Sequence, residues 1–236
     1  ALGQANTDWQ DEIFKTSFST DHNVNVSGAI PHMPYRVSVS YTNENGILKT
    51  SNMERLTGAI SLNPNFFDKK LNIQLNVKGI YNTNRFADTG AIGMATQYDP
   101  TQPIYMDGNP YGNGYFMYMK SGNNPTPVDI GLANPVSILD SKHDESTVYR
   151  SIGNAQIDYK FHFLPELRAN LNLGYDVSKS EGDVIIEDNA PMTWCQGNYK
   201  TGFGENSSYY QLKRNTLLDF YLNYAKEVGA PVSYTH

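Results

Sequence analysis

The feature that most constrains the fold is a strict alternation of apolar and polar residues over long segments. In residues 71–77 the odd positions hold Leu, Ile, Leu and Val, while the even positions hold Asn, Gln and Asn. Residues 155–163 and 167–178 repeat the pattern. Successive side chains of a β-strand point to opposite faces, so this period of two predicts two-faced strands rather than helices.

Weaker alternation extends the set of expected strands to about eight. It predicts strands in residues 24–28, 56–62 and 212–224 and a short strand in residues 13–18, in addition to the clearly alternating residues 35–42. Short connections at residues 29–34, 63–70 and 163–167 indicate sequential antiparallel pairing, and Asn45-Gly46 favours a close turn with positive φ.

Two connections are long, residues 84–146 and residues 181–206. If the turns at 63–70 and 163–167 lie at one edge of the sheet, both long loops lie at the other edge. Short turns on one side and long loops on the other are typical of outer-membrane β-barrels.

The two faces of the expected strands also fit a barrel wall. The polar face is rich in amides and hydroxyls, as in a water-filled lumen, whereas the apolar face carries aromatic rings near its ends, as in the girdles at bilayer interfaces. Those rings are Tyr35, Tyr41, Tyr81, Phe161, Phe163 and Tyr175. Arg214 shares the parity of Leu218 and Phe220, so we expect it at the membrane rim.

Composition excludes several classes of protein. The net charge of −6 gives no basic surface for nucleic acid, and the longest apolar run, residues 115–119, is far too short for a membrane-spanning helix. Cys195 is the single cysteine, which excludes a disulfide framework and a cysteine-based zinc site. Residues 1–6 lack the basic start and apolar stretch of a signal peptide.

No motif for bond chemistry is present. The five histidines are isolated, and the glycines of residues 112–114 and 202–204 lack the third glycine and the strand-to-helix setting of a phosphate loop. Asp183, Glu187 and Asp188 fall in the second long loop, where they could form a calcium site or an acid/base pair, although a solvated loop is the simpler interpretation. We therefore predict no catalytic residue, no metal and no cofactor.

Several segments resemble the barrel of SusC/RagA-type TonB-dependent outer-membrane transporters. They are residues 6–14, 35–64, 84–90, 99–105, 133–136 and 159–176, and the similarity runs to about residue 228. The resemblance implies an all-β, antiparallel, up-and-down transmembrane barrel of 22 strands closed by an N-terminal plug. It also implies the bacterial outer membrane, import of oligosaccharides or peptides driven through TonB, and a SusD-like surface lipoprotein as lid.

The chain departs from that family pattern in its extent. It shows no plug, no TonB-contacting segment and only about eight strands, so residues 1–228 resemble the first third of a barrel, which cannot close alone. Residues 229–236 leave the pattern and are expected to be a divergent or truncated tail. Contact with TonB would therefore be made through the missing N-terminal part.

The first long loop is the expected site of contact with substrate or with the lid protein. Its aromatic content argues against disorder, and short helical turns are expected near residues 90–97 and 135–139. The predicted substrate-binding residues are Tyr98, Tyr105, Tyr111, Tyr115, Phe116 and Tyr118. Alternatively, these rings simply hold the loop folded over the barrel mouth.

Two other functions remain open at this point. One is a soluble β-sandwich that binds glycan through tyrosine-rich loops, because an alternating strand also suits a sandwich with one wet face. The other is a hydrolase using Asp183 and Glu187, which ranks last because no regular element fixes that pair.

Overall fold

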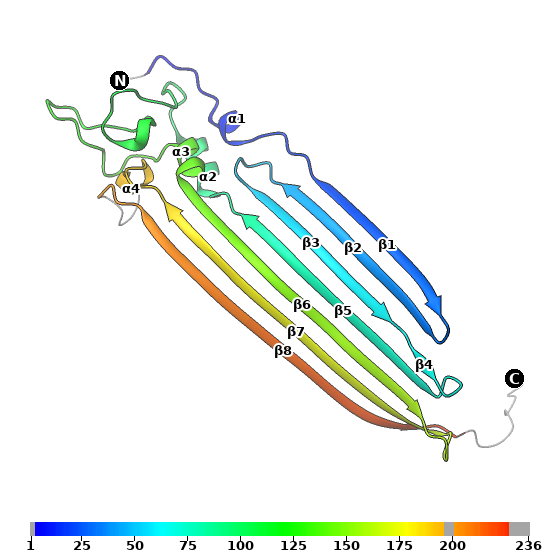
Figure 1. Cartoon of the computed structure of the whole chain (residues 1–236). Coiled ribbons are helices and arrows are strands. Elements are labelled where there is room, and N and C mark those ends of the chain that lie inside the picture. The colour runs from blue at the N-terminus through cyan, green and yellow to red at the C-terminus, as the bar shows by residue number, and fades with distance from the viewer. Residues whose placement is uncertain (1–2, 196–200, 227–236) are drawn as a thin grey trace, which may run out of the picture.

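The chain forms one antiparallel sheet with helices gathered at one end (Figure 1). The computed structural model describes residues 3–195 and 201–226. Seven strands follow one another in chain order, and the short β4 (Asn65–Phe66) pairs with the end of β5. These seven are β1 (Thr20–Ile30), β2 (Met33–Asn45), β3 (Asn52–Leu62), β5 (Leu71–Arg85), β6 (Lys142–Lys160), β7 (Leu167–Ile186) and β8 (Glu205–Tyr224).

The connections confirm the predicted up-and-down topology. Those of β1–β2, β3–β5 and β6–β7 lie at one end of the sheet, and both long loops lie at the other end with the helices (Figure 1). No helix in the described part of the chain is both long enough and apolar enough to cross a membrane.

The register gives the sheet one apolar and one polar face. Leu75 pairs with Leu62 and Ala155, which in turn pairs with Leu173, whereas the next residue, Asn76, pairs with Ser61 and Asn154. Large side chains of the apolar face are open to solvent, among them Val26, Val39, Ile60, Val77, Leu218 and Phe220. The described residues do not cover this apolar face, and a face of this size requires an apolar phase or partner against it.

Aromatic rings mark two levels of the apolar face. Tyr81 and Tyr149 are paired near the loop end with ring centroids 5.1 Å apart, and Tyr159 contacts Phe161 near the turn end at the same separation. The ten steps along β6 from Tyr149 to Tyr159 span roughly 33 Å. A tilt of about 40° reduces this to about 25 Å, the height of the apolar band of a barrel.

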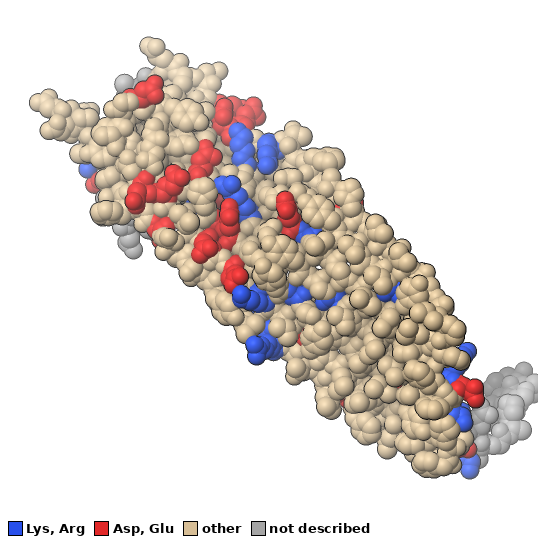
Figure 2. Space-filling model, in the orientation of Figure 1, with Lys and Arg blue, Asp and Glu red and all other residues tan. Residues whose placement is uncertain are grey.

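Charged side chains are sparse over much of the strand region seen in Figure 2, and acidic ones gather toward the helical end. Arg214, which was expected at the membrane rim, lies in the half of β8 nearer the helical end. It pairs with Val177 on the apolar face, one step from the Tyr81–Tyr149 level.

Tyr175 departs from its expected place at a girdle. Because β7 continues to Ile186, Tyr175 pairs with Gly153 in the middle of the sheet. Its ring lies where a Cβ of residue 153 would be, so the tyrosine covers a glycine in the neighbouring strand.

The predicted strand at residues 13–18 was wrong, because helix α1 (Trp9–Ile13) ends there. The Asp8 carboxylate caps this helix by accepting from the Gln10 and Asp11 amides, and the i,i+4 pair Trp9 and Ile13 is buried on one side. The segment after α1 makes only an isolated bridge, from Phe14 to Leu48.

That bridge also explains why Asn45-Gly46 does not form the expected close turn. The β2–β3 connection is six residues long, 46–51, and its positive φ of 71° is at Thr50. Its backbone is held by hydrogen bonds from the Lys15 amide to the Ile47 carbonyl and from the Lys49 amide to the Ile13 carbonyl.

The long loops are shorter than the sequence indicated, since β5 ends at Arg85 and β6 begins at Lys142. Asp183 consequently lies in β7, not in the second loop. The expected helical turns are confirmed as α2 (Gly90–Gln97) and α3 (Pro135–Ser141). The first loop also contains the 3-10 turn η1 (Gly112–Gly114), and the second loop contains α4 (Met192–Cys195). The predicted divergent tail, residues 229–236, lies outside the described residues.

Candidate functional site

The buried core of the chain lies beside the sheet end rather than on the sheet. Residues 3–14, 86–141 and 187–195, which we call the cap, fold together over the loop end of β5–β8. The cap contributes most of the buried apolar side chains, including Trp9, Ile13, Tyr98, Val136, Leu139 and Cys195. Because segments distant in sequence share this core, the first long loop is folded and presents an ordered surface.

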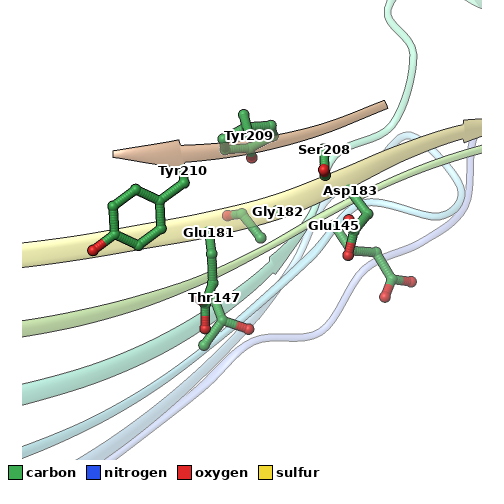
Figure 3. A pocket seen from close by; sticks show the side chains of 9 residues that line it. Glu145, Thr147, Glu181, Gly182, Asp183, Ser208, Tyr209 and Tyr210 are labelled. Carbon is green, nitrogen blue, oxygen red and sulfur yellow. The ribbon is translucent and has the colours of Figure 1, made fainter. Parts of the chain in front are cut away.

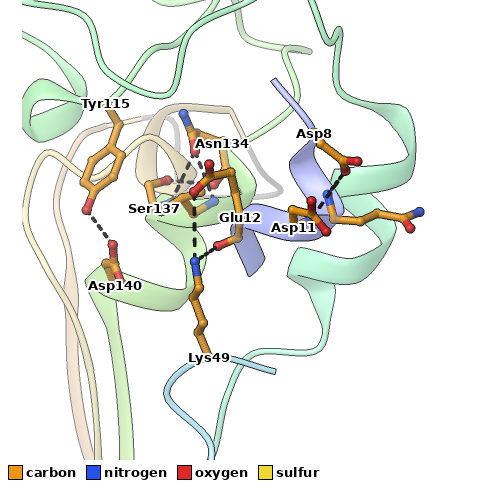
Figure 4. Close-up of polar contacts among 10 residues, drawn as sticks. Asp8, Asp11, Glu12, Lys49, Tyr115, Asn134, Ser137 and Asp140 are labelled. Carbon is orange, nitrogen blue, oxygen red and sulfur yellow. Dashed lines mark hydrogen bonds and ion pairs between the residues drawn. The ribbon is translucent and has the colours of Figure 1, made fainter. Parts of the chain in front are cut away.

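Asn134 ties three parts of the cap together and is fully buried. Its Oδ1 accepts from the amides of Val136 and Ser137 and so caps α3; Asn134 and Ser137 are labelled in Figure 4. Its Nδ2 donates to the carbonyls of Ile104 and Phe116 at 2.9 and 3.3 Å. The Pro135 that follows is favoured at the first helical position.

Tyr98, the first predicted binding residue, is only 4% exposed. Its ring makes an edge contact with Trp9, and its hydroxyl donates to the Phe116 carbonyl at 3.3 Å. Burial raises the pKa of Tyr98 well above that of a free tyrosine. This environment gives Tyr98 a packing role.

The neighbouring Asp99 fastens the N-terminal segment to the loop. Its carboxylate accepts from the Gln102 side chain and from the Thr101 amide and hydroxyl, which lowers the pKa of Asp99. The carbonyl of Asp99 accepts from Trp9 Nε1 at 3.1 Å.

Tyr105 and Tyr115 form an isolated antiparallel bridge, with ring centroids 5.3 Å apart. Tyr105 is 59% exposed, whereas the Tyr115 hydroxyl donates to Asp140 Oδ2 at 2.8 Å (Figure 4). Burial and this hydrogen bond raise the pKa of Tyr115. The exposed ring of Tyr105 therefore packs on Tyr115, which is itself held to α3 by its hydrogen bond to Asp140.

The other three predicted rings are half-buried. Tyr111 makes an edge contact with Trp194 of α4, and Tyr118 and Phe116 each contact the ring of Tyr98. The structure therefore brings the six predicted residues into the cap, but in different roles: five pack against other aromatic rings or α3, and Tyr105 is the most open.

The cap also exposes features that the sequence did not single out. Residues 119–127 form a small projection closed by the Met119–Pro127 bridge, and a Lys120–Asp129 ion pair of 3.2 Å lies at its base. Ile130 beside it is 89% exposed. No periodicity distinguishes these residues in the sequence, because their exposure follows from packing elsewhere in the cap.

A separate cavity of about 550 Å³ opens where β6–β8 reach the cap (Figure 3). Glu145, Glu181 and Asp183 line it together with Thr147, Ser208 and Tyr210. Glu187 is not part of this lining and instead contacts His143 Nε2 at 3.6 Å. The structure thus does not bring the proposed hydrolase pair, Asp183 and Glu187, into one cavity.

No metal centre is formed within residues 3–195 and 201–226, where no group of three or more His, Cys, Asp or Glu side chains could hold an ion. Cys195 is buried, its thiol donates to the Pro191 carbonyl at 3.0 Å, and burial raises its pKa to about 12. A thiol in this state is a poor nucleophile and a poor metal ligand.

Comparison with known proteins places the chain beside TonB-dependent receptors. SusC of Bacteroides thetaiotaomicron is 40% identical over 97% of this chain and 23% of SusC. TonB-dependent receptor P3 of Formosa agariphila is 27% identical over 97% of this chain and 22% of the receptor. The chain therefore spans about a quarter of the length of these relatives. No protein-family model matches the sequence.

Solved structures agree on the fold. The RagAB peptide importer in its "closed-closed" state matches 97% of this chain and 24% of the importer chain, with a TM-score of 0.67 and 15% identity. The "open-open" state matches 94% of this chain and 24% of the importer chain, with a TM-score of 0.64 and 18% identity. An open sheet is what a section of a larger barrel wall should form.

Proposed function

We propose that this chain, which is a segment of the barrel of a SusC/RagA-type TonB-dependent receptor, is part of the wall and mouth of an importer. The full-length receptor would lie in the bacterial outer membrane and take up oligosaccharides or peptides. The observation that carries this proposal is the two-faced sheet: its exposed apolar face suits lipid, and its amide-rich face suits a water-filled passage.

Three partners are proposed for the full-length receptor. Lipid would cover the apolar face, and TonB would supply energy through a part of the full-length receptor outside this chain. A SusD-like surface lipoprotein would sit over the cap, where Ile130 and Tyr105 are the most exposed large apolar side chains. The similar solved structures are those of the RagAB peptide importer, which supports such a partner.

Within the cap, Tyr105 is the residue we propose to contact substrate directly. The half-buried Tyr111, Tyr115 and Tyr118 would border the contact, and Tyr98 and Phe116 would hold the loop in shape. An exposed aromatic ring suits stacking on a sugar face or packing on a peptide side chain.

The soluble β-sandwich that binds glycan is not supported, because a sandwich would need a second layer over the apolar face. A hydrolase is also unsupported, since similar proteins are named as receptors or importers and the two carboxylates are apart.

The test is substitution of Tyr105 by alanine in the full-length receptor, with Phe163→Ala as the control. Phe163 is an exposed aromatic residue at the opposite end of the sheet. Loss of one exposed aromatic contact should weaken uptake or lid association roughly three- to tenfold in Tyr105→Ala. Unchanged uptake and lid association would contradict the role of Tyr105.

The wider role of the cap is tested by deleting the exposed residues 121–125 of the projection. A larger deletion of residues 107–127 would also remove Met117, which is buried in the cap, so the shorter deletion is the cleaner experiment. We expect reduced lid association or uptake with normal barrel assembly. Parental levels of both would require the proposed role of this projection to be abandoned.

A further inference from the structure

The polar face of the sheet carries a band of positive charge near the middle of the strands. Lys78 pairs with Ala59 and Ile152, and Arg150 and Lys213 both pair with Ser178. Arg36 in β2 lies on the same face, one row of alternate residues nearer the turn end than Lys78. Arg55 in β3 lies one row nearer the loop end than Arg150. We call these five residues, Arg36, Arg55, Lys78, Arg150 and Lys213, the basic band.

Most of this charge is not neutralised by residues that the structure describes. Asp176 receives two hydrogen bonds from Arg150, at 2.9 and 2.7 Å. Among the described residues, none of the other four cations lies within 4.0 Å of a carboxylate, although an Arg55 nitrogen lies 3.2 Å from the Met53 sulfur. Asp21, the other carboxylate at this level, accepts from the Thr42 hydroxyl at 2.8 Å. A local excess of cations thus occurs in a chain whose net charge is −6.

The band borders a groove of about 600 Å³ on the polar face. Arg55, Lys78 and Arg150 contribute to its lining. The Asp21 carboxylate also lines it, so three cations face one carboxylate there. Most of the remaining lining is made of short amide and hydroxyl side chains, including Asn23, Ser38, Ser40, Thr57 and Asn82. Such a surface offers hydrogen bonds to a polar chain and fixed positive charges to its anionic groups.

We propose that the basic band binds carboxylate groups of the imported oligomer, so that the cargo of the full-length receptor is anionic. This inference rests on the proposed function, because only an importer passes cargo along the polar face. Cations lining a narrow passage concentrate anions there, and their attraction is screened less between barrel walls than in open water. Carboxylates occur both on acidic sugars and on acidic peptides, and the groove accommodates the chemistry common to both.

The test removes two unpaired charges from the band in the full-length receptor with the double variant Arg55→Gln/Lys78→Gln. Arg214→Gln is the matched control, since it removes a cation at a similar level from the apolar face. The probes are oligogalacturonate and oligoglutamate, each beside a neutral counterpart, maltooligosaccharide and an uncharged Gly-Ser peptide. Binding and uptake are measured at low and high salt.

We expect at least one acidic probe to bind the parent receptor better than its neutral counterpart, with affinity falling as salt rises. Each removed charge should weaken acidic binding roughly two- to fivefold, with little effect on the neutral probe. Arg214→Gln should behave like the parent. If the double variant fails to assemble, Lys78→Gln alone provides the same comparison.

Three results would overturn the proposal. In the first, the parent receptor prefers the neutral probes. In the second, the variant loses binding of acidic and neutral probes equally. In the third, both variants in the band fail to assemble, because the band holds an acidic segment of the receptor itself. If the parent imports neutral oligomers but not acidic ones, the proposal of anionic cargo is contradicted while the proposed importer function stands. A parent that imports neither class contradicts the proposed function as well.

Discussion

At the scale of single residues, the cap depends on a few buried polar contacts. Asn134 accepts from the two amides that begin α3 and donates to the carbonyls of Ile104 and Phe116, each of which also accepts a second hydrogen bond, from the Phe116 amide and the Tyr98 hydroxyl respectively. The sequence could not reveal this role, because the partners at Ile104 and Phe116 are 30 and 18 residues away. An asparagine before a proline indicates a helix cap but says nothing about long-range contacts.

Replacing Asn134 by alanine should loosen the cap without unfolding the sheet. Loss of the helix cap and of two bonds to buried carbonyls should cost roughly 2–4 kcal/mol of local stability. Hydrogen exchange of the α3 amides in the full-length receptor measures this directly. Asn124→Ala, a change at an exposed loop position, should leave exchange unaltered. Equal protection of α3 in both variants would show that Asn134 is not central to the cap.

Cys195 predicts a definite response to pH. Burial raises its folded-state pKa from 9.0 to about 12, so the folded thiol keeps its proton after the unfolded thiol has lost it. Its contribution to cap stability is therefore constant below about pH 9 and declines as pH rises from 9 towards 12. Maleimide labelling of native protein at pH 8 should be slow and should accelerate on unfolding. Rapid labelling of the native cap would contradict the burial.

At the scale of elements, the alternating pattern predicted where strands lie but not where they end. Beyond Tyr81 and Tyr149, both faces carry polar residues, such as Thr83 and Asn84 in β5 and Ser146 and Thr147 in β6. The backbone ladder continues through these residues, but the contrast between faces is lost. Between the Tyr81–Tyr149 level and the cap, backbone hydrogen bonds continue the strands although their sequence no longer alternates.

The two faces should respond oppositely to charge. Leu75 lies midway between the aromatic levels, so Leu75→Arg should destabilise the barrel by about 2–4 kcal/mol, whereas Asn76→Arg should be tolerated. Leu171 pairs with Ile157, one step from Tyr159, so Leu171→Arg should cost less than Leu75→Arg. Folding of the full-length receptor into lipid, measured over denaturant, gives these differences. Tolerance at the leucines together with failure at Asn76 or Asn172 would reverse the assignment of faces.

At the scale of the whole molecule, the chain is a sheet with two open edges and a cap at one end. β1 and β8 each lack a neighbour on one side, and the apolar face is uncovered in the described part of the chain. Sheet edges and apolar faces of this kind promote association in water. The sequence predicted this openness from its strand count, while the cap core, formed by segments as distant as α1 and α4, could not be inferred from local patterns.

The isolated 236-residue chain should consequently not persist as a soluble monomer. Sedimentation without detergent should show aggregates, and addition of detergent should reduce their size by covering the apolar face. A detergent-free monomer that unfolds cooperatively and reversibly would instead favour a soluble sheet protein.

The central claim is that alternate residues of one strand face lipid and water. The most direct measurement places single cysteines at positions 73–78 of β5 in the full-length receptor, with Cys195→Ser and no other reactive cysteine. Each is labelled with a fluorophore and challenged, in vesicles, with a lipid-soluble or a water-soluble quencher. We predict lipid quenching at 73, 75 and 77 and its absence at 74, 76 and 78. Uniform quenching along the strand, or the reverse alternation, would contradict a barrel wall with this orientation.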